Sequence, residues 1–256
     1  MTDELKARLA RTRFPRASAY DPRWVIGNVM GPHPLWLMEW LCTELDLPAG
    51  ARVLDLGCGK ALTSVFLARE YGLRVVAADL WVPPGENWTR ITAAGCADDV
   101  IPVHAEAHDL TFADGYFDAV VSVDAYHYFG TDELYLPYLT RFLRPGGQIG
   151  MAVPALAAEL TDDRVPEHLR PYWEPDFWTF HSADWWRRLW YRSGTVDVDR
   201  ADFWADGWRD WALWNEVCAE VGDNEFVVEN AGREARMLRL DAGRNLGFAR
   251  VIARRR

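Results

Sequence analysis

The chain has 256 residues, half of them hydrophobic, so it can bury an extensive core and form one large α/β domain. Its 28 basic and 38 acidic side chains give a formal net charge of −10. This balance argues against a broad nucleic-acid-binding surface, which needs clustered positive charge. The closing Arg254 to Arg256 does not alter that expectation.

The cysteines and the apolar segments indicate in which cellular compartment the protein works and whether it binds a metal or a membrane. The four cysteines lack the paired spacing of a metal site or of a redox motif, so we expect reduced thiols and no metal. The N-terminal stretch MTDELKARLARTRFPR is charged and has no apolar segment typical of a signal peptide. No run approaches the roughly 20 apolar residues that span a bilayer. These patterns predict a cytoplasmic protein with no membrane partner.

The first 50 residues predict a loop followed by one helix. The segment WVIGNVMGPHP, residues 24–34, is too rich in glycine and proline for regular structure. It is either a connector or a loop that crosses the mouth of a site. The segment PLWLMEWLCTELDLPAG, residues 34–50, predicts a helix with one apolar face that ends at Pro48 and Gly50.

Short apolar runs then alternate with amphipathic stretches. The runs RVLDLG, LRVVAADL, DVIPVHA, FDAVVSV and GQIGMAV predict five strands. Several of them are apolar on successive residues, as in parallel strands that are buried on both faces. Helices are predicted between them over 62–71, 86–97 and 132–142. This alternation favours right-handed crossovers and a doubly wound α/β sheet.

The chain becomes rich in aromatic residues after about Pro154, where nine of its fourteen tryptophans lie. We predict helices over 182–194, with Ser182 as N-cap and Gly194 past the end, and over 207–222 and 232–243. Strands are predicted over 195–199 and 246–253. Because no flexible linker interrupts the chain, we expect a single domain over 1–256. Its segments would be a covering loop and helix at 1–50, a cofactor-binding core at 51–154, a substrate-pocket or lid region at 155–246, and a last strand with a basic tail at 247–256.

A glycine-rich turn follows the first predicted strand. In VLDLGCGKA, which begins at Val53, an acid near the strand end precedes a G-x-G turn into a helix, and such a turn brings the backbone close to a ligand. The dinucleotide fingerprint would require its third glycine at Leu62. That mismatch argues against a pyrophosphate. A simple tight turn is the alternative interpretation.

Acidic residues follow the next two strands. Asp79 stands 20 residues after Gly59, at the end of the second strand, where an acid can accept both ribose hydroxyls of an adenosine. Glu106 follows the third strand, and DAYHYF follows the fourth. All of these residues would meet at the carboxyl edge of the sheet, where ligands bind in open α/β folds.

Together these segments resemble the class I S-adenosylmethionine-dependent methyltransferases over about residues 34–153. VLDLGCGKA is similar to their acidic glycine-rich signature, with Ala61 at the third glycine position. VVAADLW, EAHDLTF, FDAVVSVDAYHYF and FLRPGGQI resemble the later signatures in order and spacing. The resemblance implies a seven-stranded, mostly parallel, Rossmann-like sheet with added aromatic-rich helices near the C-terminus. It also implies S-adenosylmethionine as cofactor, with S-adenosylhomocysteine as product, and is closest to methyltransferases of small molecules.

Twelve residues are predicted to bind the cofactor. They are Met30, Gly31, Asp55, Gly57, Gly59, Lys60, Asp79, Leu80, Trp81, Glu106, Ala107 and Ser122. The resemblance assigns Asp79 to the ribose, and it places Glu106 and the Ala107 N–H at the adenine. Asp55 would either accept the amino group of the methionine moiety or brace the loop amides.

Three of these residues have two possible interpretations. Lys60 is one of only two lysines, beside Lys6; it either pairs with the cofactor carboxylate or is a solvated side chain. Trp81 either covers the adenine face or belongs to the core. Met30, with Gly31, would lie at the methionine end if the loop at 24–34 closes over the cofactor.

The candidates for catalysis follow the fourth strand. Methyl transfer is an in-line displacement, in which alignment supplies much of the acceleration and a base is needed only when the acceptor loses a proton. His127 and Asp124 are the predicted catalytic residues, and packing is the alternative role for His127. Most of the tryptophans after Pro154 would be core, while some would line a pocket for a flat, aromatic or cationic acceptor.

The sequence thus predicts methyl transfer from S-adenosylmethionine to an oxygen or nitrogen of a small molecule. Methylene transfer to a lipid, as in cyclopropane synthases, is the enzymatic alternative. A non-catalytic S-adenosylmethionine-binding scaffold is the alternative from another class.

Overall fold

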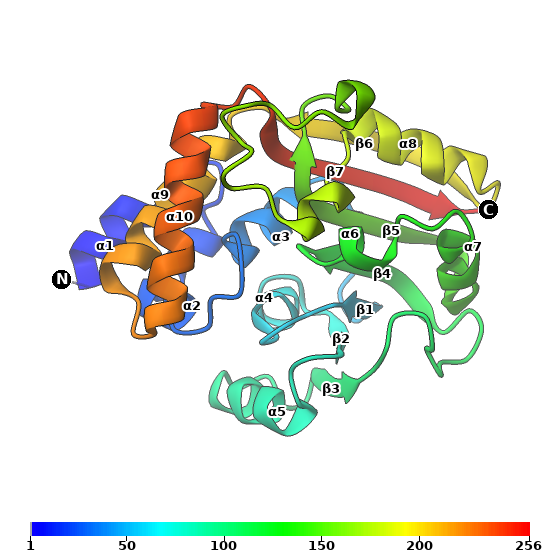
Figure 1. Cartoon of the computed structure of the whole chain (residues 1–256). Helices are drawn as coiled ribbons and strands as arrows, with labels where there is room; N and C mark the ends of the chain where they lie inside the picture. Colours follow the sequence, from blue (N-terminus) through cyan, green and yellow to red (C-terminus); the bar gives the residue numbers. More distant parts are fainter. Residues whose placement is uncertain (1) are drawn as a thin grey trace.

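Seven strands form one sheet in the order β3-β2-β1-β4-β5-β7-β6 (Figure 1). The structure, a computed structural model, describes residues 2–256. The strands are β1 Arg52–Leu56, β2 Arg74–Asp79, β3 Val100–His104, β4 Phe117–Val123, β5 Leu143–Leu156, β6 Val196–Trp204 and β7 Leu246–Arg255. The first five pair in parallel, whereas β7 lies antiparallel between β5 and β6. The predicted seven-stranded, mostly parallel α/β sheet is confirmed.

Helices cover both faces of this sheet. They are α1 Thr2–Leu9, α2 Pro22–Ile26, α3 Pro34–Cys42, α4 Leu62–Tyr71, α5 Pro84–Ala93, α6 Tyr126–Phe129, α7 Tyr135–Leu139, α8 Ala183–Arg192, α9 Gly207–Val221 and α10 Glu225–Asp241. Successive residues of β1 pack into different hydrophobic cores. Val53 packs in the core that includes α3, α4 and α9, and Leu54 packs in the core that includes α7 and α8. Within residues 2–256, no helix is both long and apolar enough to cross a membrane.

The helices near the two ends of the chain pack together (Figure 1). Arg8 of α1 pairs with Glu220 of α9 at 2.6 Å, and Arg11 pairs with Asp210 at 2.5 Å. The first residues of the chain therefore rest on the aromatic-rich region that follows the core strands.

Several predicted elements match the structure closely. The helix predicted over 62–71 is α4 with the same bounds. Ser182 is the N-cap of α8, because its hydroxyl oxygen accepts a hydrogen bond from the Trp185 N–H at 3.2 Å. Gly194 lies just past the end of that helix with φ +69.

The predicted helix over 34–50 is too long, because α3 ends at Cys42. Arg250 of β7 donates to the Trp40 carbonyl at 2.5 Å and to the Thr43 hydroxyl at 2.8 Å, and so caps the end of the helix. The chain then turns toward β5, where the Asp46 N–H donates to the Gln148 side chain at 2.8 Å. These long-range partners end the helix before Pro48 is reached.

Other boundaries also differ from the prediction. In place of the helix predicted over 132–142, the structure has only α7 and a single 3-10 turn. The helix predicted over 86–97 corresponds to α5, which begins and ends earlier. The helix over 232–243 begins earlier, at Glu225, because the Asn224 side chain accepts from the Phe226 N–H at 2.9 Å and caps α10. The final strands are also longer than predicted, since β6 and β7 pair along most of their length.

Candidate functional site

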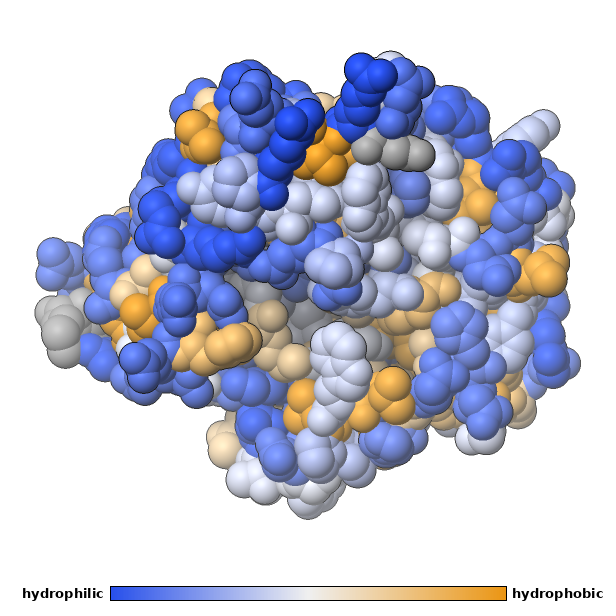
Figure 2. All heavy atoms as spheres, in the orientation of Figure 1, coloured by the Kyte–Doolittle hydropathy of each residue, from blue (hydrophilic) through white to orange (hydrophobic). Residues whose placement is uncertain are grey.

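A cavity of about 320 Å³ opens at the carboxyl ends of the central strands. Its walls come from the segments that follow β1, β2, β3 and β4, and from the loop between α2 and α3. Figure 2 shows a hollow near the middle of this face, with hydrophilic side chains above it and hydrophobic ones below. The volume lies within the usual range of small-molecule sites. The cavity therefore forms at the edge of the sheet where the sequence predicts a ligand.

Two glycines of the β1–α4 loop are required by its geometry. Gly57 and Gly59 have φ of +73 and +53, a region that side chains disfavour. A Cβ on Gly57 would lie 2.4 Å from the Cβ of Ala125, and one on Gly59 would lie 2.9 Å from the Met30 sulfur. Ala61, at the third glycine position, also has a left-handed φ of +61. The loop therefore keeps a glycine-like backbone there without a glycine.

The N–H groups of this loop are largely used within the protein. Those of Gly57 and Cys58 donate to the Ala78 carbonyl at 2.8 and 3.1 Å, and that of Ala61 donates to the Cys58 carbonyl at 2.9 Å. The Gly59 N–H donates to Asp79 at 2.7 Å. Four of the five N–H groups from 57 to 61 thus have an acceptor already. A phosphate-binding loop instead directs such groups at its ligand.

Asp79 joins the glycine loop to the segment after β2. One carboxylate oxygen accepts from Gly59, and the other accepts from the N–H groups of Trp81 and Val82 at 2.8 and 2.9 Å. The side chain is nearly buried but lines the cavity. Asn87, which the sequence analysis missed, donates from its amide to the Gly59 carbonyl at 2.8 Å. Its only sequence signal is its place in the first turn of a helix that two prolines introduce.

Two of the predicted cofactor residues lie behind the cavity wall. Asp55 is buried and accepts from the hydroxyls of Thr63 and Ser64, each at 2.6 Å, so it holds the first turn of α4. Burial raises the pKa of Asp55 to about 6, although the two hydroxyls act in the opposite direction. Ser122 is also buried and donates to the Leu56 carbonyl at 2.7 Å, which ties β4 to the end of β1. Neither residue lines the cavity.

The segment after β3 forms another wall of the cavity. Glu106 lines it, and its carboxylate accepts from the backbone N–H of His108 at 3.0 Å and contacts the His108 ring at 3.1 Å. Ala107 is buried beside it, and its carbonyl accepts from the Tyr135 hydroxyl at 3.2 Å. Both residues therefore lie where the sequence analysis expected them, at the cavity.

Leu80 and Trp81 follow Asp79 along the same wall. The side chain of Trp81 is 70% exposed, so it is not a core residue. Its ring is tilted against that of Tyr128 from α6, with 6.0 Å between the ring centroids. The two rings can narrow the opening of the cavity from opposite sides.

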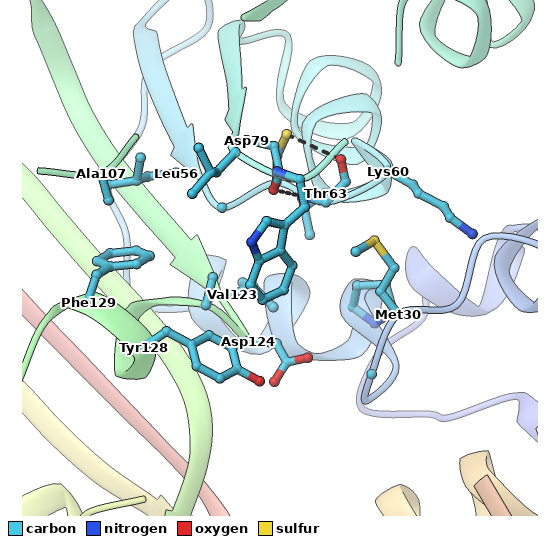
Figure 3. Close-up of a pocket in the computed structure, with 18 of the residues that line it drawn as sticks. Met30, Leu56, Lys60, Thr63, Asp79, Ala107, Val123, Asp124, Tyr128 and Phe129 are labelled. Carbon is cyan, nitrogen blue, oxygen red and sulfur yellow. Dashed lines mark hydrogen bonds between the residues drawn. The ribbon is translucent and has the colours of Figure 1, made fainter. Parts of the chain in front are cut away.

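The loop between α2 and α3 closes the side of the cavity next to the glycine turn. Met30 and Gly31 line the cavity, and the Gly31 carbonyl accepts from the Trp214 indole of α9 at 2.9 Å. Lys60 lines it too, but its side chain extends away from Asp79 (Figure 3). Partial burial lowers the pKa of Lys60, and nearby Arg90 acts in the same direction. The predicted loop over the site is therefore present, anchored by a tryptophan that sequence reasoning did not connect to it.

Asp124 faces the cavity at the end of β4. It has φ +54, an uncommon conformation for a residue with a side chain, and its carboxylate packs against Gly31. A Cβ on Gly31 would lie only 2.2 Å from its Oδ2. Burial raises the pKa of Asp124 well above its usual range, and the nearby Glu234 carboxylate of α10 raises it further. Asp124 therefore places a carboxyl group at the cavity wall in surroundings that favour its protonated form.

His127, the other predicted catalytic residue, lies outside the cavity. Its ring is fully buried and packs at 5.4 Å on Phe180, and neither ring nitrogen has a hydrogen-bond partner among residues 2–256. Burial lowers the pKa of His127 to about 3. These observations support the packing role that the sequence analysis left open and not the role of a base.

The tryptophans that follow Pro154 do not line the cavity, contrary to the expectation that some would. Trp186, Trp190 and Trp214 are fully buried in the two cores. Trp214 reaches the site only through its bond to Gly31. The aromatic groups that line the cavity come instead from Trp81, Tyr128 and Phe129, with His108 beside them.

Comparison with known proteins agrees with this geometry. Residues 53–147 match the family model described as a methyltransferase domain. The chain is 30% identical over 150 residues to methyltransferase GfsG of Streptomyces halstedii, an alignment that covers 58% of this chain and 51% of that protein. The chain thus spans about half the length of this curated relative.

Two solved structures share the fold. Phosphoethanolamine N-methyltransferase 2 of Haemonchus contortus, in complex with S-adenosyl-L-methionine, superposes with a TM-score of 0.74 at 18% identity, covering 98% of this chain and 60% of that one. A methyltransferase of Geobacter sulfurreducens with S-adenosyl-L-homocysteine gives a TM-score of 0.64 at 22% identity, covering 96% and 99%. Residues 53–147 of this chain thus match a methyltransferase domain, and the chain shares the fold of solved structures that contain S-adenosyl-L-methionine or S-adenosyl-L-homocysteine.

Proposed function

We propose that the protein transfers a methyl group from S-adenosylmethionine to an oxygen or nitrogen atom of a small-molecule acceptor. The observation that carries the proposal is the hydrogen-bond pattern of the glycine loop, whose N–H groups bond to Ala78, Asp79 and Cys58. Such a loop can lie against a ligand without supplying donors to a phosphate. S-adenosylmethionine contains an adenosine and no phosphate, and it therefore suits the loop better than a dinucleotide does.

The charge of the cavity supports the same cofactor. Two carboxylates, those of Asp79 and Glu106, line it beside the Asp124 carboxyl with its raised pKa, against the single ammonium of Lys60. An excess of negative charge in a concave site favours a cationic ligand, and the sulfonium of the cofactor is cationic. A nicotinamide dinucleotide would instead bring its anionic pyrophosphate into this field.

The lining residues suggest how the cofactor would be held. Asp79 would accept the ribose hydroxyls on the lone pairs that its backbone partners leave free, and Glu106 and Ala107 would contact the adenine. Trp81 would cover the adenine from the open side. Lys60 and Met30 would lie at the methionine end, beside the glycine loop.

The residues beyond the cofactor would align the acceptor and exclude water. When bound, the cofactor supplies a methyl group that is already activated for displacement. Tyr128 and Trp81 would then narrow the opening, and Asp124 would orient the acceptor and accept its proton if it has one to lose. The proposal assigns no chemical step to His127.

Binding of S-adenosylmethionine is the first test. Calorimetric titration of the purified protein is expected to give saturable binding of S-adenosylmethionine and S-adenosylhomocysteine, but not of NAD or FAD. Asp79→Asn should weaken this binding about tenfold or more, since a charged acceptor is lost. Asp98→Asn, at an exposed carboxylate, is the matched control. Binding of NAD in place of S-adenosylmethionine would overturn the proposal.

Transfer itself is tested with the radiolabelled methyl donor and a panel of small acceptors. Label on an alcohol, phenol or amine supports the proposal. Label that appears only in the cyclopropane ring of an unsaturated lipid would instead establish methylene transfer. Tight binding of the donor without transfer to any acceptor would indicate a scaffold.

A further inference from the structure

The helix α5 contacts two walls of the cavity without lining the cavity itself. Among residues 2–256, the lining residues include none of Pro84–Ala93. The Arg90 guanidinium of this helix donates to the Asn28 side-chain oxygen and to that of Asn87, each at 3.0 Å. Asn28 lines the cavity from the covering loop, residues 27–33 between α2 and α3. Arg90 therefore joins this loop to α5.

Asn87 continues the connection to the glycine turn. Its side chain is buried, and its amide donates to the Gly59 carbonyl at 2.8 Å. The Gly59 N–H donates to Asp79 at 2.7 Å, so side chains hold this glycine at both its N–H and its carbonyl. Three hydrogen bonds thus lead from the covering loop, through α5, to the glycine turn that lines the cavity.

The two asparagines can make these bonds in only one orientation of their amides. A guanidinium only donates hydrogen bonds, so each asparagine must direct its oxygen at Arg90 and its NH2 group elsewhere. The NH2 group of Asn28 donates to the Trp24 carbonyl at 2.8 Å, and that of Asn87 donates to Gly59. Both asparagines therefore use their oxygen and their NH2 group at once, as expected of a network that fixes one geometry.

The covering loop also packs directly on the glycine turn. A Cβ on Gly59 would lie 2.9 Å from the sulfur of Met30, which follows Asn28 closely in that loop. The loop and the turn are thus joined twice, by this contact and by the path through Arg90. Movement of the loop away from the cavity would have to break both.

The two bonds from Arg90 to the asparagines lie in a more sheltered setting than its third bond. That bond joins Arg90 to Glu86 at 3.2 Å, and the Glu86 side chain is 58% exposed, so the pair contributes little. The Arg90 side chain is only 23% exposed. Its charge-assisted bonds to the asparagines are therefore the ones expected to hold the loop.

We propose that Arg90 and Asn87 are positioning residues that couple the covering loop to the glycine turn and so prolong the residence of a bound cofactor. The inference rests on the proposed function and adds a means of retaining S-adenosylmethionine. A cofactor that lies against the glycine turn steadies Gly59, and the path through α5 then steadies the loop. The coupling is reciprocal, because a loop held in place also favours the turn conformation that binds the cofactor.

The first readout is hydrogen exchange of loop amides in the protein without ligand. The N–H groups of Asn28 and Val29 donate to the carbonyls of Val25 and Ile26, each at 3.1 Å, so their exchange reports opening of the loop. Asn87→Ala removes no hydrogen bond of the loop itself. It should nevertheless speed exchange of these amides about threefold or more.

The second readout is the dissociation rate of S-adenosylhomocysteine, measured by surface plasmon resonance. Arg90→Met should speed dissociation about tenfold and change association less than about threefold, because the loop retains a ligand that is already bound. Arg90→Lys keeps the charge but lacks the two-pronged donor, so its dissociation rate should fall between. Glu86→Gln removes only the exposed partner of Arg90 and is the control, which should leave both rates unchanged.

A double-mutant cycle separates the path from the loss of charge. Arg90 also adds positive charge near Lys60, so its loss alone would weaken binding of a ligand with a carboxylate. Asn28→Ala and Asn87→Ala are neutral changes at residues that bond to Arg90 and, among residues 2–256, not to each other. Their combined effect on dissociation should differ from the product of the single effects by about threefold or more. In the Arg90→Met background this coupling should vanish.

The outcomes separate this inference from the proposed function. If the wild-type protein does not bind S-adenosylhomocysteine, the proposed function itself fails. The inference alone is overturned if the ligand binds but Asn87→Ala leaves loop exchange unchanged, or if Arg90→Met leaves dissociation unchanged. It is equally overturned if the two asparagines act independently, or if they stay coupled without Arg90. Cooperative urea unfolding of each variant shows that it is folded.

Discussion

Gly57 combines two constraints that can be separated experimentally. Its φ of +73 would strain any side chain, and a Cβ there would also collide with Ala125. Gly50 has a similar φ of +80 but open space around it. We expect Gly57→Ala to lower the free energy of unfolding by about 2–4 kcal/mol, and Gly50→Ala by about 1 kcal/mol or less. Urea unfolding measures both, and equal losses would contradict the collision.

Asp55 is expected to make stability depend on pH in an unusual direction. Its pKa is about 6 in the folded protein, against 3.8 as the ordinary value. The folded state therefore binds more protons between these values, and this group makes the free energy of unfolding fall as pH rises from about 4 to 6. Relative to Asp55→Asn, the wild type should lose up to about 3 kcal/mol over this window.

The measurement is urea unfolding of both proteins at several pH values. Asp223→Asn removes an exposed carboxylate and serves as the control. Parallel pH profiles for the wild type and Asp55→Asn would show that the Asp55 carboxyl titrates normally in the folded protein.

Lys60 can be tested with a ligand that lacks its predicted partner. If Lys60 pairs with the carboxylate of the cofactor, Lys60→Met should weaken binding of S-adenosylmethionine about twofold to fivefold, as expected for a partly exposed ion pair. Binding of 5′-methylthioadenosine, which has no carboxylate, should be unchanged. Lys6→Met alters the other lysine and is the control. Equal weakening for both ligands would contradict the pairing.

At the scale of elements, α9 holds the loop over the site. Trp214 is fully buried, and its indole N–H binds the Gly31 carbonyl. Trp190 of α8 is equally buried, but its indole N–H has no hydrogen-bond partner in the described part of the chain. Trp214→Phe and Trp190→Phe should each lower the free energy of unfolding by about 1–3 kcal/mol. Only Trp214→Phe should speed amide hydrogen exchange over residues 28–31, and equal exchange in both variants would contradict the anchoring role.

Helix boundaries are predicted correctly where the local sequence signals agree with the tertiary contacts. The apolar pattern of α4 and the Ser182 cap of α8 are local, and both helices begin where the sequence indicates. The end of α3 depends on Arg250, which lies 210 residues away from Trp40 in the chain. No pattern near Cys42 reports such a partner. Local patterns therefore predict a helix that continues to the next local terminator, Pro48.

At the scale of the whole molecule, the predictable part of the site is the part that the strand order brings together. Asp79 and Glu106 could be placed because each follows a strand whose carboxyl end meets the glycine loop. The choice between Asp124 and His127 depends on which way a short helix turns after β4, and residue type alone does not indicate this. Glu234 could not be found at all, because it approaches from α10 across more than 100 residues of intervening chain.

The internally bonded glycine loop also limits how this fold could change its cofactor. Ala61 already has the backbone conformation of a glycine, so Ala61→Gly would complete the three-glycine pattern without freeing a single N–H group. In a dinucleotide site, the N–H groups of Gly57, Cys58 and Gly59 would have to leave their present acceptors and donate to the phosphates. The ends of β1 and β2 would then have to follow a different path. The hydrogen bonds between the ends of β1 and β2 therefore disfavour a dinucleotide in this chain. Point substitutions at the glycine positions do not change these bonds.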